Sequence, residues 1–216
     1  HHPPGMRHRR LQLDRPHPSI DHPVARAARV QARVAVLTRL PRALVDQPAV
    51  VVDALAHPNG WRRDTAQRLL VERGAKTAVP ALTALASRAP DWRTRLHALW
   101  TLDGIDAIQP ATVTSALEDS SRDVRLSAIR IAERGLGEAN HPIQAAVLKR
   151  LDDPDWAVHQ QLAASIGALP PGARESAAVA ILERYGNDPV VMDAVLSGLR
   201  GSEMAVLDRL LSSKRN

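Results

Sequence analysis

The sequence predicts an all-α protein, an α-solenoid of about five helical hairpins with a closing C-terminal helix. Three observations indicate this fold. The 216 residues are rich in Ala, Leu, Val and Arg, with no Phe, no Cys and one Tyr, so the core must be aliphatic and helices are favoured over strands. A twelve-residue pattern recurs along the chain, and a second apolar segment precedes each copy, as in repeats built from helix pairs.

The recurring pattern is a helix that begins at a capping residue. The segment "NGWRRDTAQRLL" (59–70) aligns with segments starting at 91, 121, 155 and 188, at successive offsets of 32, 30, 34 and 33 residues. Its first column accepts a hydrogen bond from an unpaired N–H of the first turn, and its eighth and twelfth columns lie on one apolar face. These columns read Asn59, Asp91, Ser121, Asp155, Asp188, then Ala66, Ala98, Ala128, Leu162, Val195, then Leu70, Leu102, Ala132, Ile166, Leu199.

A first helix is expected before each of these second helices, at 48–57, 75–88, 110–119, 142–151 and 170–186. Four of the five open with Pro, which suits the first helical turn. Glycines follow the second helices, where left-handed C-caps are expected, at Gly74, Gly104, Gly135, Gly167 and Gly201. The predicted units are therefore 48–74, 75–104, 105–135, 141–168 and 170–201, stacked on one another because one hairpin cannot bury its apolar face alone. The closing helix is predicted at 202–213, capped by Ser202.

Residues 1–47 do not fit the repeat. They are rich in Pro, His and Arg, which predicts a disordered arm or linker, although "VARAARVQARVAVLTRL" (24–40) has the spacing of a lone amphipathic helix ended by Pro41. Residues 1–42 hold nine Arg and two Asp, a charge of +7, and the remaining 20 basic and 21 acidic residues give −1. The excess of positive charge therefore belongs to the arm, and the repeat body is close to neutral.

The repeat type follows from its motif. The Trp-Leu-Gly-Tyr pattern of tetratricopeptide repeats and the Thr-Pro-Leu-His of ankyrin repeats are absent. The pattern Asp-x-x-Val-Arg-x-x-Ala-x-x-x-Leu, clearest in "DVRLSAIRIA" (123–132), resembles the HEAT-like, armadillo-type repeats in their short variant.

Three longer phrases resemble one bacterial family more closely: "LAHPNGWRRDTAQRLLVERG" (55–74), "RLHALWTLDG" (95–104) and "DDPDWAVHQQLAASIGALP" (152–170). Over residues 48–211 the chain is similar to the HEAT-repeat segment of membrane-bound-dehydrogenase-like proteins common in planctomycetes. In those proteins the segment lies between a sorbosone-dehydrogenase-like β-propeller and a cytochrome c domain. The resemblance implies an exported bacterial protein whose partner is such a propeller or cytochrome c domain.

The chain also departs from that family. The family often has a second Trp where Arg62 stands, and Arg where His159 and Met192 stand. The chain has no cysteine to attach a c-type haem and no glycine- and aspartate-rich propeller segment. The catalytic and electron-carrying parts of the family are therefore expected to lie outside this chain.

The fifth column of the repeat forms an arginine ladder, Arg63, Arg95 and Arg125, which continues as His159 and Met192. On the expected concave face these guanidinium groups could form a track for phosphates or carboxylates. The alternative is that they pair with Asp64, Asp91 and Asp123 and bridge adjacent repeats. The replacement of Arg by His and Met in the last two units favours pairing.

Three tryptophans, Trp61, Trp92 and Trp156, fall in the first turn of their helices. There they could stack on bases or sugars or anchor a partner helix, or they could pack over the loop between repeats. Trp100 is expected in the core. The candidate binding surface on the concave face is thus Trp61, Arg63, Trp92, Arg95, Arg125, Trp156 and His159.

The motifs exclude several function classes. The chain has no nucleophile elbow, Walker loop or dinucleotide fingerprint, and its scattered histidines have no ligand spacing, so no catalytic residue, cofactor or metal is expected. No apolar stretch approaches the ~18 residues of a membrane span. The leading interpretation is a non-catalytic scaffold that binds protein domains. The alternative is a nucleic-acid-binding module, as in HEAT-like DNA glycosylases, using the basic arm and the ladder. The neutral body disfavours nucleic acid.

Overall fold

The computed structural model of the chain describes residues 47–139 and 141–213. Within these ranges every regular element is helical: eleven α-helices and four short 3-10 helices, with no strand. The all-α fold class predicted from the sequence is therefore confirmed. The arm and its candidate helix at 24–40 lie outside the described residues.

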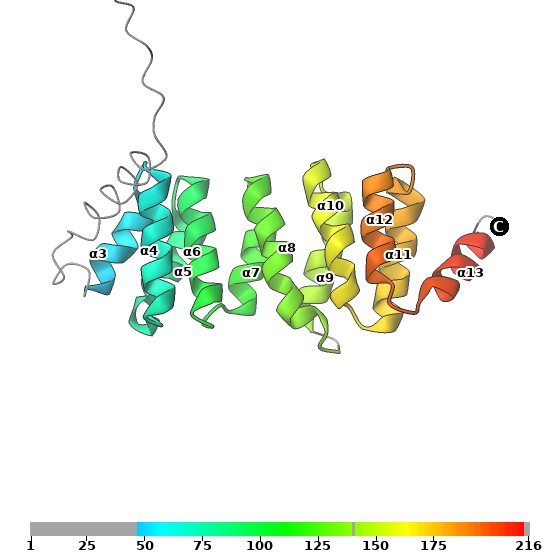
Figure 1. The fold of residues 1–216 in the computed structure, drawn as a ribbon, viewed down its shortest axis with the longest axis horizontal. Helices are drawn as coiled ribbons and strands as arrows, with labels where there is room; N and C mark the ends of the chain where they lie inside the picture. The colour runs from blue at the N-terminus through cyan, green and yellow to red at the C-terminus, as the bar shows by residue number, and fades with distance from the viewer. Residues whose placement is uncertain (1–46, 140, 214–216) are drawn as a thin grey trace, which may run out of the picture. The chain divides into compact units, whose positions relative to one another are not determined.

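The α-helices form five hairpins and a last helix, which follow one another in a row (Figure 1). The first helices of the hairpins are α3 (Pro48–Asp53), α5 (Val79–Arg88), α7 (Pro110–Leu117), α9 (Pro142–Leu148) and α11 (Pro171–Tyr185). The second helices are α4 (Gly60–Glu72), α6 (Trp92–Gly104), α8 (Arg122–Leu136), α10 (Trp156–Ser165) and α12 (Pro189–Gly198), and α13 (Glu203–Ser213) follows. The 3-10 helices are η1 (Ala54–Ala56), η2 (Lys76–Ala78), η3 (Lys149–Asp152) and η4 (Ile166–Ala168).

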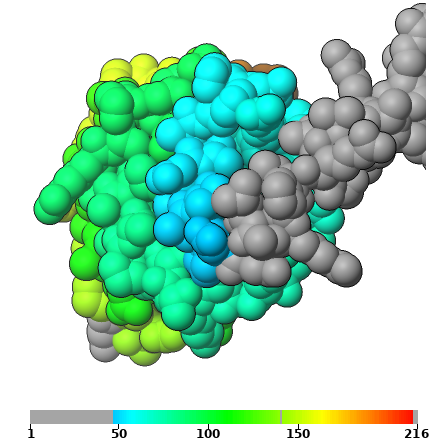
Figure 2. All heavy atoms as spheres, turned by 90° about the vertical axis from the view of Figure 1, so that its left-hand side faces the viewer, coloured from blue at the N-terminus to red at the C-terminus, as the bar shows by residue number. Residues whose placement is uncertain are grey.

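The second helices form one layer, in which α4, α6, α8, α10 and α12 contact one another in that order. In the other layer α3 contacts α5, α5 contacts α7, and α7 contacts α9, while α11 contacts α13. Figure 2 looks onto the end of the row where α3 and α4 lie. A cleft at this end is lined by residues of α3, the end of α4 and η2, among them Val51, Leu69 and Lys76.

Side-chain caps fix where most second helices begin. The side chains of Asn59, Asp91, Asp155 and Asp188 each accept a hydrogen bond from an N–H of the first turn, as the first column predicts. The exception is Ser121, whose side chain makes no capping bond.

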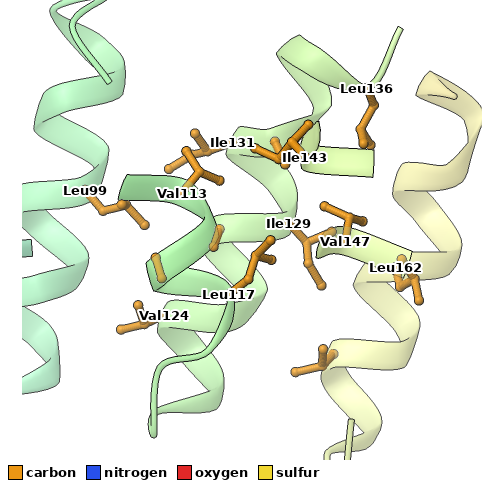
Figure 3. Close-up of a cluster of buried hydrophobic side chains, with 14 of the residues drawn as sticks. Leu99, Val113, Leu117, Val124, Ile129, Ile131, Leu136, Ile143, Val147 and Leu162 are labelled. Atoms are coloured by element: carbon orange, nitrogen blue, oxygen red, sulfur yellow. The ribbon is translucent and has the colours of Figure 1, made fainter. Parts of the chain in front are cut away.

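The two layers enclose one continuous aliphatic core. Figure 3 shows its central part, where Val113 of α7, Ile129 of α8 and Val147 of α9 lie between Leu99 of α6 and Leu162 of α10. Each of these side chains is at most 3% exposed. Because every hairpin shares its apolar side chains with the next, the core is a property of the stack rather than of one unit.

The glycine prediction was correct at two positions and wrong at three. Gly74 and Gly201 have the positive φ of left-handed C-caps, 56° and 89°. Gly104 and Gly135 instead lie within α6 and α8, and Gly167 lies within η4. At Gly104 and Gly167 the cause is close packing.

A Cβ at Gly104 would lie 2.7 Å from Cγ2 of Val71, and one at Gly167 would lie 3.0 Å from Cα of Gly198. At these two sites glycine allows neighbouring repeats to approach, and the left-handed residue after α6 is Asp106, with φ of 54°.

Candidate protein-interaction surface

The arginines of the ladder lie near the starts of the second helices. Arg125 shows the hydrogen-bond geometry of the ladder most completely. Its Nε and Nη2 donate to the two carboxylate oxygens of Asp153 at 2.7 and 2.8 Å. Its Nη1 donates to the backbone carbonyls of Asp119 and Ser120 at 2.9 and 3.2 Å. The side chains of Arg125 and Asp153 are 10% and 0% exposed. One guanidinium therefore joins the loop of its own hairpin to the loop of the next.

Arg95 repeats this arrangement one unit earlier. It donates to both carboxylate oxygens of Asp119 at 2.7 and 2.8 Å, and its Nη1 donates to the carbonyls of Ala89 and Pro90. Burial raises the pKa of the Asp119 carboxyl, but the hydrogen bonds from Arg95 and from the Ser121 N–H, with the nearby arginine charges, hold its pKa below the ordinary value. Asp153 behaves in the same way, with Arg125 as the main donor. Both carboxylates are therefore stabilised as anions.

Arg63 keeps the backbone half of the arrangement and lacks the carboxylate. Its Nη1 donates to the carbonyls of His57 and Pro58 at 2.8 and 2.9 Å. Asp119 and Asp153 each stand six residues before the ladder position of their own repeat, and in the second repeat that position holds Ala89. The buried Nε of Arg63 has no hydrogen-bond partner.

The predicted carboxylate partners were wrong, although Arg95 and Arg125 do bridge adjacent repeats. Asp91 caps α6, Asp123 lies 3.8 Å from Nε of Arg122, and Asp64 lies 3.8 Å from Nε2 of His97. These three carboxylates lie on, or cap, the helix that carries the arginine. The guanidinium groups of Arg95 and Arg125 instead bind a carboxylate in the loop between the two helices of the next repeat. Asp119 and Asp153 were missed because they fall outside the aligned twelve-residue window.

An aromatic contact takes the place of the arginine at the fourth junction. His159 is buried and stacks on Tyr185, with ring centroids 4.3 Å apart and an interplanar angle of 23°. The Tyr185 hydroxyl donates to the Leu151 carbonyl at 2.9 Å and lies 3.2 Å from Nε2 of His159. The ladder positions from Arg95 to His159 thus serve the junctions between repeats.

The four tryptophans differ in exposure. Trp61 and Trp156 are each 39% exposed, and the edge of Trp156 meets His159 at 6.4 Å. Trp92 is half-buried against the core, and the guanidinium of Arg93 lies 4.7 Å from the centroid of its ring, a cation–π contact. Trp100 also packs partly buried against the core. Of the three candidate tryptophans, Trp61 and Trp156 offer the larger aromatic surface to a partner.

The groups of this surface differ in what they leave accessible. Its guanidinium groups at Arg95 and Arg125 are occupied by internal carboxylates, while its exposed part is aromatic. Within residues 47–139 and 141–213 no three His, Asp or Glu side chains gather where they could hold a metal ion. In the same ranges no helix has the length and hydropathy needed to cross a membrane.

Comparison with known proteins gives the class to which this geometry belongs. Residues 48–130 match the family model of HEAT repeats. No curated protein matches the chain. With the repeat match and the stacked hairpins, the described residues form an all-α, HEAT-like solenoid. HEAT repeats generally present extended surfaces to other proteins.

Proposed function

We propose that this chain is a non-catalytic scaffold that binds a protein domain, with a contact surface around the starts of α4, α6 and α10. The observation that carries the proposal is the pair of exposed tryptophans, Trp61 and Trp156, in the first turns of two helices of one layer. Tryptophan contributes a large contact area at little cost in conformational entropy and is enriched among residues that dominate interface energies.

The burial of the arginine ladder supports a protein partner over a phosphate ligand. A ladder that bound phosphates would have to release Asp119 and Asp153 from forks of 2.7 and 2.8 Å. Breaking such a buried pair leaves an uncompensated charge and costs about 3–5 kcal/mol. The guanidinium groups of Arg95 and Arg125 therefore hold the scaffold rigid, and the neighbouring tryptophans are free to contact a partner.

The partner is proposed from the sequence resemblance. The chain would be the HEAT-repeat part of a larger dehydrogenase- and cytochrome-type bacterial protein, holding or spacing its β-propeller and cytochrome c domains. The three matching phrases in residues 55–170 support this parentage. The near-neutral repeat body fits a role in positioning domains.

A pull-down tests the proposal. The bait is this chain, and the prey are propeller and cytochrome c domains expressed from the source genome. We expect capture of one domain by the wild type and a loss of about tenfold or more for the Trp61→Ala, Trp156→Ala double variant, as for interface hot spots. The matched control is Arg68→Ala, Glu72→Ala, which removes an exposed pair on α4. Equal capture by both double variants would place the contact surface elsewhere.

A further inference from the structure

The junction between the first two hairpins carries hydrogen-bond donors that lack the acceptor found at the next two junctions. At those junctions Nε and Nη2 of Arg95 and of Arg125 bind the two carboxylate oxygens of an aspartate. Nε of Arg63 is buried and has no hydrogen-bond partner. Its Nη2 has no acceptor among the described residues either, because both hydrogen bonds of this side chain are made by Nη1. Buried donors are normally paired, so the unpaired fork indicates a partner from elsewhere.

A backbone N–H of the facing loop is unpaired as well. In the loops before α4, α8 and α10, the residue six positions before the ladder residue accepts a hydrogen bond from the N–H two residues further along. These bonds run from Asn59 to His57 at 3.0 Å, from Ser121 to Asp119 at 2.7 Å and from Asp155 to Asp153 at 3.0 Å. In the loop before α6 the position holds Ala89, which has no side-chain acceptor. Within the described ranges nothing accepts from the N–H of Asp91.

These three unpaired N–H groups are the set that binds a carboxylate elsewhere in the stack. At the third junction Nε and Nη2 of Arg125 and the N–H of Asp155 all donate to the carboxylate of Asp153. Arg63 and Asp91 stand at the equivalent positions of the first junction. A guanidinium fork fits the two oxygens of a planar carboxylate with parallel hydrogen bonds. The first junction therefore has the donors for a carboxylate that its own loop does not supply.

A glycine leaves one side of the Arg63 guanidinium group accessible. Gly60 stands in the column that holds Trp92, Arg122 and Trp156 in the next three units. A Cβ at Gly60 would lie 3.3 Å from Nη2 of Arg63, so a side chain there would crowd this nitrogen. Nε is the one buried, unpaired nitrogen of this partly exposed side chain, and Nη2 is within reach of solvent. A carboxylate can therefore approach the fork from the side of Nη2.

We propose that Arg63 and the N–H of Asp91 bind a carboxylate group supplied from outside this chain, and that it belongs to an acidic side chain on a loop of the bound protein domain. The next two junctions support a loop-borne carboxylate, since each holds an aspartate of this kind. Trp61, in the first turn of the same helix, is 39% exposed and supplies the aromatic part of the contact. The source of the carboxylate rests on the proposed function, whereas its binding at the fork does not.

Nuclear magnetic resonance with sodium acetate tests the fork without a partner domain. We expect the Nε–H signal of Arg63 and the amide signal of Asp91 to shift and to saturate, half-maximally near ~10 mM acetate. Sodium chloride at equal ionic strength should shift neither signal. Ala89→Asp supplies a carboxylate from within the chain and should weaken acetate binding at least ~10-fold, and Arg63→Met should abolish the shift of Asp91. The matched control Arg68→Met, at an exposed position of α4, should bind acetate as the wild type does.

Two results would overturn binding at the fork. Signals that move alike in acetate and in chloride would show that it selects no carboxylate, and an undiminished shift in Ala89→Asp would place the acetate elsewhere.

The pull-down tests the source of the carboxylate. Ala89→Asp should reduce capture of the bound domain about tenfold with Trp61 and Trp156 unchanged, and equal capture would overturn the acidic loop of the partner. A wild type that captures no domain would overturn the proposed function and with it this source, while the acetate titration would still decide whether the fork binds a carboxylate.

Discussion

At the scale of single residues, buried ion pairs hold the second and third junctions of this stack. The arginine column could be recognised in the sequence because it recurs inside the aligned helix. Its carboxylate partners could not, since Asp119 and Asp153 lie 24 and 28 residues after their arginines in loops whose lengths vary from unit to unit. The sequence therefore predicted which cations recur but not which anions they meet.

Removing one partner of the Arg125–Asp153 pair is expected to destabilise the fold strongly. Arg125→Ala leaves the fully buried carboxylate of Asp153 without its main donor, and we expect a loss of about 3–5 kcal/mol in the free energy of unfolding. Arg122→Ala, on the same helix but 59% exposed, should change it by no more than about 0.5 kcal/mol. Urea denaturation followed by circular dichroism measures both, and equal small losses would contradict the role assigned to the fork.

Stability is expected to fall in two stages as the pH is lowered. Burial lowers the pKa of His97, which also contacts Gln67 at 2.7 Å. The folded state then binds fewer protons than the unfolded state, so stability decreases below the ordinary histidine pKa of about 6.5. The depressed pKa values of Asp119 and Asp153 give stability that is present above about 3.9 and is lost as the pH falls further.

Thermal unfolding midpoints between pH 7 and pH 3 check this expectation. His97→Gln should remove the first stage and keep the second. Asp103 acts in the opposite sense, because burial raises its pKa and its protonation favours the folded state as the pH falls. A His97→Gln variant with the wild-type profile between pH 7 and pH 5 would show that another group is responsible.

At the scale of elements, caps predicted where helices begin better than glycines predicted where they end. An N-cap is local, since its side chain bonds to an N–H two or three residues away. A glycine near the end of a helix can be required for either of two reasons: a left-handed turn, or the close approach of a neighbouring helix. The approach depends on distant residues, such as Val71 for Gly104 and Gly198 for Gly167.

The loop before α6 offers a way to complete the first junction. Ala89 occupies the position held by Asp119 and Asp153 in the next two loops. Its carbonyl accepts from Nη1 of Arg95, as the carbonyl of Asp119 accepts from Nη1 of Arg125. Ala89→Asp should give Arg63 the carboxylate that its unpaired Nε lacks. We expect a gain of about 0.5–2 kcal/mol in urea denaturation. The gain should vanish in the Arg63→Met background, and a gain that persists there would have another cause.

The contact between η4 and the end of α12 is expected to tolerate no Cβ. Gly167→Ala would place a methyl group 3.0 Å from Cα and 3.2 Å from the carbonyl oxygen of Gly198, both backbone atoms, and should cost about 1–3 kcal/mol. Gly172→Ala, in the first turn of α11 with nothing within 4 Å of the new Cβ, should instead stabilise by up to about 1 kcal/mol. Chemical denaturation distinguishes the two, and a neutral Gly167→Ala would mean that the helices separate at little cost.

At the scale of the whole molecule, the sequence repeat made the fold predictable but did not predict which side chains are exposed on the surface. The buried eighth and twelfth columns recur in every unit, so the stack over 48–213 could be predicted from spacing alone. The exposure of particular side chains could not, because it depends on neighbours that differ between units. Trp92 and Trp156 occupy the same column, yet one is half-buried against the core and the other is 39% exposed.

The charge of the molecule gives the last prediction, which separates the scaffold from a nucleic-acid-binding module. Removing residues 1–42 takes away nine Arg and two Asp, so the formal net charge falls from +6 to −1. The buried core of the described residues begins later, at Val51, Val52 and Leu55. The shortened chain should therefore keep its helical circular dichroism and a melting temperature within about 4 °C of the full chain.

Binding to a DNA duplex, followed over a salt series, then measures where any phosphate contacts lie. The full chain should bind weakly and with a steep loss of affinity as salt increases, because its cationic arm displaces counterions. The shortened chain should show no such binding, since Arg95 and Arg125 are held by internal carboxylates. If the shortened chain kept a steep salt dependence, its arginines would have to reach phosphates, and the ladder would be a nucleic-acid surface and not a brace between repeats.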